Sequence, residues 1–158
     1  MRRAGLWAIG VGVLASAGLV AIERAYASKD DHPSRCTLAT LTGQYLFGAP
    51  GTLFPPAFGV PKQSIFSSAG FHIFDGDGTG TDFVTFVVNG MNQNVPSPVA
   101  TTYTLNPDCT GTLSVQNGPN FNIFVALDGS GLSVVSTDLG AAYSEVLHRS
   151  VSFGKTAP

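Results

Sequence analysis

Residues that can transfer protons alternate along the last predicted strand of the chain. Tyr143, Glu145 and Arg149 lie two or four positions apart, so their side chains share one side of a strand. Tyr103 lies on an earlier predicted strand. Inside an apolar pocket such groups could carry acid–base catalysis, because desolvation shifts their pKa values toward neutral pH. The sequence therefore predicts these four residues as catalytic candidates if they point inward; the alternative is that Glu145 and Arg149 face solvent.

A second set of residues could bind a ligand without reacting with it. His72 lies within an aromatic run at 71–74, where the alternative is a place at the rim of the domain. Phe-rich strands beside an apolar loop suit a small apolar molecule, since ligand sites are concave and mostly apolar. The candidates for ligand contact are Phe54, Phe58, Phe71, His72 and Phe86.

Residues 75–82 (DGDGTGTD) place oxygen-bearing side chains around glycines, as a calcium loop does. The twelfth position, where a calcium loop carries a bidentate acid, is Phe86. Asp and Gly also tolerate the positive φ angles of a tight turn between strands. The prediction is a hairpin turn, and no metal or cofactor is expected anywhere in the chain.

These side chains must be positioned by strands. Runs of residues that favour strands alternate with turns of Asp, Asn, Gly and Pro to the end of the chain. Consecutive strands joined by short turns form antiparallel meanders, and eight can close into a barrel without exposed edges. The sequence predicts an all-β, eight-stranded antiparallel up-and-down barrel, with a two-sheet sandwich as the alternative. The predicted strands are 44–47, 64–74, 82–88, 100–105, 111–116, 121–127, 132–137 and 141–153.

The segment Ala49–Pro61 holds four prolines among apolar residues. Proline lacks the N–H that strand pairing uses, so this segment is predicted to be a loop that begins after Gly48. Because it is apolar, it should fold over one end of the domain, either closing the core or covering a ligand cavity.

The N-terminus predicts export. Arg2 and Arg3 precede an apolar run, and Ala25-Tyr26-Ala27 fits a cleavage site, so residues 1–27 are predicted to be a signal peptide with a helical apolar part. The alternative is a retained membrane anchor, because the run is long enough to cross a bilayer. Residues 28–35 form a charged lead-in that should be disordered, and 36–154 the barrel domain.

Export and composition also indicate which covalent bond and which partners to expect. An oxidising compartment and two cysteines predict a disulfide between Cys36 and Cys109, in a secreted or periplasmic protein. The formal net charge is −2, with 8 basic against 10 acidic residues. Nucleic acid is therefore not an expected partner. Contact with a membrane is expected only if the signal segment is retained.

Three stretches carry a resemblance to known proteins. Gly43-x-Tyr45 opens the first strand, Phe74-Asp75-Gly76-Asp77-Gly78 forms the hairpin turn, and residues 103–112 (YTLNPDCTGT) span a later turn. After a signal peptide, this pattern resembles a group of small exported bacterial β-barrel proteins without assigned function. Their general form is similar to the calycin and allene-oxide-cyclase-like barrels. The Gly-x-Trp that often opens a lipocalin strand is absent, since the only Trp is Trp7, and no functional residue is carried over.

Three functions agree with these observations. The leading hypothesis is an exported, non-enzymatic barrel that binds a small apolar ligand, because barrels of this size can hold one small molecule. The first alternative is a structural or surface-interaction protein whose barrel is filled by side chains. The second is a cofactor-free cyclase or isomerase that acts inside the barrel.

Overall fold

A computed structural model describes residues 35–150. The predicted signal peptide, nearly all of the lead-in and the end of the predicted last strand lie outside the described residues. Within residues 35–150, no helix is long and apolar enough to span a membrane.

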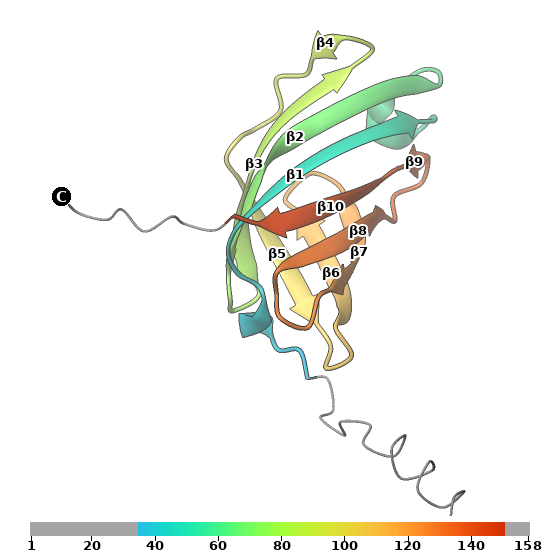
Figure 1. The fold of residues 1–158 in the computed structure, drawn as a ribbon. Coiled ribbons are helices and arrows are strands. Elements are labelled where there is room, and N and C mark those ends of the chain that lie inside the picture. Colours follow the sequence, from blue (N-terminus) through green and yellow to red (C-terminus); the bar gives the residue numbers. More distant parts are fainter. Residues whose placement is uncertain (1–34, 151–158) are drawn as a thin grey trace, which may run out of the picture. The chain divides into compact units, whose positions relative to one another are not determined.

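The chain forms a closed antiparallel barrel of eight main strands (Figure 1). Each strand pairs with the next along the chain, and β1 also pairs with the final strand β10, which closes the sheet. This closure confirms the predicted all-β barrel and shows that the sandwich alternative is wrong. The main strands are β1 (Thr42–Leu53), β2 (Ser64–Asp75), β3 (Thr79–Val88), β5 (Val99–Leu105), β6 (Thr110–Val115), β7 (Asn120–Val125), β8 (Gly131–Ser136) and β10 (Ser144–Arg149).

Four short elements complete the described chain. They are the 3₁₀ turns η1 (Leu38–Thr40) and η2 (Ala57–Gly59) and the two-residue strands β4 (Met91–Asn92) and β9 (Ala141–Ala142). Strand β4 pairs with β3, and β9 pairs with β1.

The first strand is much longer than predicted and includes Pro50. The prediction that 49–53 cannot pair is wrong because pairing on one side of β1 stops beside Pro50. The β1 ladder runs from Tyr45 to Gly48 against β10 and resumes at Thr52 against β9. Gln44 and Pro50 are an even number of positions apart, so their backbone N–H and C=O positions point to the same side of β1. The carbonyl oxygen of Gln44 accepts a hydrogen bond from the N–H of Ser150, which follows β10. The side of Pro50 that lacks an N–H therefore faces the interruption, where no neighbouring strand carbonyl requires a donor.

The interruption between β9 and β10 is Tyr143, so the predicted strand 141–153 is two strands in the described chain. The rest of the proline-rich segment lies at one end of the barrel, as predicted. There Ala57 of η2 is buried and packs in a small cluster with Leu53 and Phe66.

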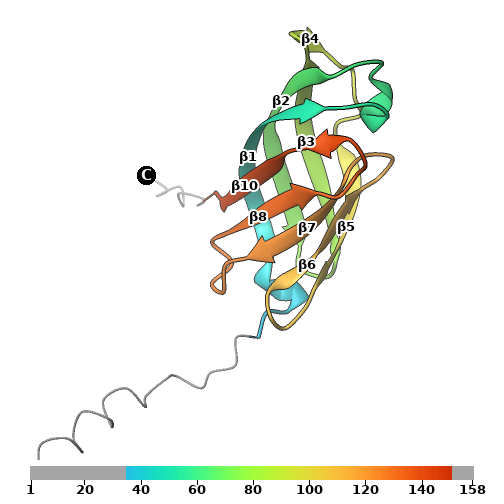
Figure 2. The same ribbon diagram turned by 90° about the vertical axis from the view of Figure 1, so that its right-hand side faces the viewer.

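The two ends of the barrel differ (Figure 2). We call the end with the turns after β2, β5 and β7 the turn end. The other end carries the connections after β1, β3, β6 and β8, which include the long segments 54–63 and 89–98, and we call it the loop end. At the turn end, the segment 36–41 packs against the main core cluster, in which Leu41 is fully buried. The Cys36–Cys109 disulfide joins this segment to the turn after β5, with a Cα–Cα distance of 5.1 Å. The predicted bridge is confirmed, and disulfides are typical of extracellular or periplasmic proteins.

Candidate functional site

A cavity of about 160 Å³ lies in the loop-end half of the barrel and is partly open to solvent. Inward-facing residues of β1, β2, β3, β5, β6, β7, β8 and β10 line it. At the loop end, Phe58, Val95 and residues 116–119 complete its wall. Four polar or titratable strand residues reach it, Ser68, His72, Asp82 and Glu145, and so does Tyr143 between β9 and β10.

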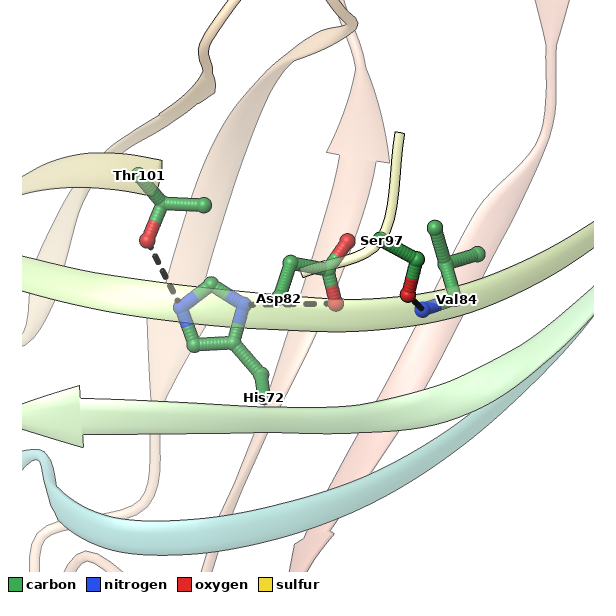
Figure 3. A network of polar contacts seen from close by, with 5 residues as sticks. All are labelled: His72, Asp82, Val84, Ser97 and Thr101. Carbon is green, nitrogen blue, oxygen red and sulfur yellow. Dashed lines mark hydrogen bonds and ion pairs between the residues drawn. The ribbon is translucent and has the colours of Figure 1, made fainter. Parts of the chain in front are cut away.

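His72 and Asp82 come from neighbouring strands and point toward one another (Figure 3). The β2–β3 hairpin pairs these two residues directly, and their closest nitrogen and oxygen, Nδ1 and Oδ1, are 3.8 Å apart. Nε2 of His72 lies 3.0 Å from the Thr101 hydroxyl on β5, within hydrogen-bond distance. The imidazole also stacks on Phe74, with ring centroids 4.1 Å apart. His72 is therefore a fixed wall residue, only 2% exposed, and the alternative that places it at a rim is wrong.

Gly80 makes the contact between His72 and Thr101 possible. A Cβ at this position would lie 2.9 Å from both Nε2 of His72 and the hydroxyl of Thr101, and 2.5 Å from the carbonyl oxygen of Ile73. Such separations are far below ordinary carbon contacts. Only glycine leaves room for the hydrogen bond.

The carboxyl group of Asp82 is buried without a hydrogen-bond donor on one oxygen. The residue is 8% exposed, and its Oδ1 atom has no partner. The separation of 3.8 Å from His72 is too long for a hydrogen bond. Burial raises the pKa of Asp82 to about 6, partly offset by a hydrogen bond from the Phe83 backbone. Burial also lowers the pKa of His72 to about 4, so at neutral pH the imidazole is uncharged and Asp82 lacks a cationic partner.

Glu145 supplies a second carboxyl to the same cavity from β10. Burial and, to a lesser extent, the negative charge of Asp82 together raise the pKa of Glu145 to about 7. Burial and then the charge of Glu145 raise the pKa of the Tyr143 phenol. At neutral pH Glu145 therefore exists in both protonation states, which suits it either to exchange a proton or to bind a cation.

Aromatic rings form much of the remaining wall. Tyr143 meets Phe66 edge to face at 4.7 Å between centroids, and Phe121 at 5.8 Å. Phe66 also contacts Phe86, which in turn contacts Phe58. Gly51 leaves space for this cluster, because a Cβ there would lie 2.6 Å from the Cβ of Tyr143.

The structure separates the four catalytic candidates. Tyr143 and Glu145 line the cavity. Tyr103 lies in the turn-end core, where its hydroxyl donates a shared hydrogen bond to the carbonyl oxygens of Leu38 (2.9 Å) and Leu41 (3.1 Å). Arg149 lies at the turn end too, where Nε donates to the Tyr45 hydroxyl at 3.0 Å. Neither Tyr103 nor Arg149 is part of the cavity wall.

The ligand-contact candidates divide in the same way. Phe58, His72 and Phe86 line the cavity, although Phe58 is 47% exposed at the loop end. Phe54 is exposed and does not line it. Phe71 stacks on Phe83 at 4.5 Å, and both belong to the strand parity opposite to His72 and Asp82, which is the outer face of the sheet.

Several wall residues were not among the predicted site residues. Asp82 is one of the polar residues of the sequence that could do chemistry, and a hairpin turn centred on Asp77 pairs position 82 with position 72, but Asp82 was not placed among the catalytic or ligand-contact candidates. The residues that were missed are apolar or small and resemble core positions in the sequence; they are Phe47, Phe66, Ser68, Leu113, Phe121 and Val134.

The predicted hairpin at 75–78 forms, and its acidic side chains are used within the turn. Asp77 accepts hydrogen bonds from the backbone and hydroxyl of Thr79, and Asp75 accepts one from the same hydroxyl.

Among the residues described, no group of three or more His, Cys, Asp or Glu could hold a metal ion. Comparisons of the chain with protein-family models, curated proteins and solved structures find no match.

Proposed function

We propose that this protein is an exported barrel that binds one small, mainly apolar molecule in the loop-end cavity. The observation that carries the proposal is the cavity itself, which lies among aromatic and aliphatic side chains while the other half of the barrel is packed. A volume of about 160 Å³ is close to that of an apolar protein cavity known to bind benzene. The expected ligand therefore has the size of a single ring with a short substituent.

The cavity also bears on the alternative of a purely structural barrel. Side chains that fill a barrel interior leave few voids larger than a water molecule. Retaining polar groups such as Asp82 and Glu145 beside an unfilled volume is costly for stability, and a ligand site gives a reason for that cost.

Calorimetric titration with benzyl alcohol tests the proposal, with two neighbouring serines as variant and control. Ser68 lines the cavity and Ser67 is exposed on the outer face. Ser68→Phe should fill the cavity and abolish binding, while Ser67→Phe should bind as the wild type does. A ligand of this size should bind with a Kd of about 0.1–1 mM. No binding by the wild type, or equal binding by both variants, would contradict the proposal.

A cofactor-free isomerase is a second candidate because Glu145 and Asp82 face one cavity and both titrate near neutral pH. One carboxylate could remove a proton α to a carbonyl group while the other acid returns a proton at the γ carbon. The cavity limits substrates to ring size, so long polyenes are unsuitable. Cyclohex-3-en-1-one is a fitting probe, since its conversion to the conjugated ketone moves one proton only. A rate no faster than buffer, or unchanged in Glu145→Gln, would remove this candidate.

A further inference from the structure

Resting on the proposed function, we propose that the ligand is a small organic ammonium, in which a protonated amine on a ring-sized apolar body is bound by Asp82 and Glu145. The apolar body would contact the aromatic wall, and the ammonium group would donate hydrogen bonds to the two carboxyl groups.

The first support is the unpartnered oxygen of Asp82. Its Oδ1 is buried, accepts no hydrogen bond, and belongs to a residue that lines the cavity. The nearest group that could carry a positive charge, His72, is 3.8 Å away and itself desolvated. A buried carboxylate oxygen without a donor is costly, so a donor brought by a ligand would be strongly favoured.

The second support is the charge of the wall. Glu145 reaches the cavity from β10, which only β1 separates from the β2–β3 hairpin that carries Asp82. The other titratable groups that face these two acids are His72 and Tyr143. None of the described residues that line the cavity is Lys or Arg. A carboxylate or phosphate ligand would meet two acids and no cation, whereas an ammonium would meet two acceptors.

The third support is the aromatic wall. Phe66, Phe86, Phe121 and Tyr143 lie around the same cavity. Faces of aromatic rings attract organic cations, and the attraction is greater where water is excluded. A bare metal ion would need more oxygen or nitrogen ligands than the described residues group together. An organic cation satisfies both the rings and the acids.

The test compares ligands of matched shape by calorimetry at pH 7.5. Benzylamine carries the ammonium, benzyl alcohol is its neutral counterpart and benzoate its anionic one. Benzylamine should bind about tenfold or more tightly than benzyl alcohol, since hydrogen bonds to charged groups are the stronger ones. Lowering the pH to 5 should weaken benzylamine binding, because both carboxyls then gain protons, while benzyl alcohol should be little affected.

Glu145→Gln should remove most of the preference for benzylamine over benzyl alcohol. Asp77→Asn removes one negative charge from an exposed turn at the other end of the barrel and should keep the wild-type ratio. Thermal unfolding of both variants establishes that they are folded. Equal affinity for the amine and the alcohol, or tighter binding of benzoate, overturns this inference and leaves the proposed function intact. No binding of any of the three overturns both.

Discussion

The raised pKa of Glu145 on β10 leads to a quantitative prediction about how the free energy of unfolding depends on pH. The folded protein holds the proton of Glu145 up to a pKa of about 7, against an ordinary value of 4.5. Because this pKa is raised in the folded state, the contribution of Glu145 to stability is fully present below pH 4.5 and is lost as the pH rises through 7. One pKa unit corresponds to about 1.4 kcal/mol, so the full loss is about 3 kcal/mol. Glu145 is only partly buried, so screening by solvent should reduce the measured value to about 1–3 kcal/mol.

Glu145→Gln keeps the shape of the side chain and removes the titration. The variant should match the wild type near pH 4.5 and exceed its free energy of unfolding by about 1–3 kcal/mol at pH 8. Urea denaturation at half-unit pH steps measures this difference. Comparing the two proteins at each pH cancels most of the contribution of His72, whose lowered pKa acts in the opposite direction between pH 4 and 6.5.

Asp77→Asn is the matched control for this experiment. Hydrogen bonds from Thr79 lower the pKa of Asp77, so its titration lies below the pH range measured. This variant should shift the whole curve without changing its slope between pH 5 and 8. The reasoning is refuted if Glu145→Gln is less stable than the wild type at pH 8, or if its curve stays parallel to the wild-type curve.

Two further predictions concern the elements that hold the cavity. Replacing Cys36 and Cys109 with serine opens a disulfide that spans 73 positions, and the unfolding free energy should fall by about 4 kcal/mol on the chain-entropy model, measured by urea denaturation; a loss below about 1 kcal/mol would contradict it. Gly80→Ala should cost about 2 kcal/mol or more and displace His72, seen as a changed imidazole NMR signal, because its Cβ meets backbone and ring atoms. Gly48→Ala, whose Cβ meets nothing closer than 3.9 Å, is its control and should be nearly neutral.

Turn chemistry was sufficient to predict the strands of the barrel, since all eight predicted segments overlap observed strands. The Asp, Asn, Gly and Pro clusters end each strand where they provide hydrogen bonds or positive φ angles, as at Gly76 and Gly129. The error at Pro50 came from a local rule applied without the neighbouring strand. A proline fits a strand when its missing N–H faces a break in pairing, and that break depends on Tyr143, far along the chain.

Site residues were predicted less well because the alternation of side chains along a strand does not give their full position. It shows whether a side chain points into or out of the barrel, but it does not show the height of that side chain along the barrel axis. Tyr103 and Arg149 share the inward parity of cavity residues on their strands, yet they lie at the turn end. Tyr143 and Glu145 lie nearer the loop end and reach the cavity. The height of each residue depends on the register of all the strands between, which a single sequence does not display.

The most direct test of the ligand-binding cavity is a methyl NMR titration with benzyl alcohol. Val134 and Leu147 line the cavity, while their neighbours Val135 and Val146 are exposed on the outer face of the same strands. Binding in the cavity should produce saturable shifts of the Val134 and Leu147 methyl signals and leave Val135 and Val146 unchanged. The absence of saturable shifts, or shifts confined to Val135 and Val146, would contradict a ligand site inside the barrel.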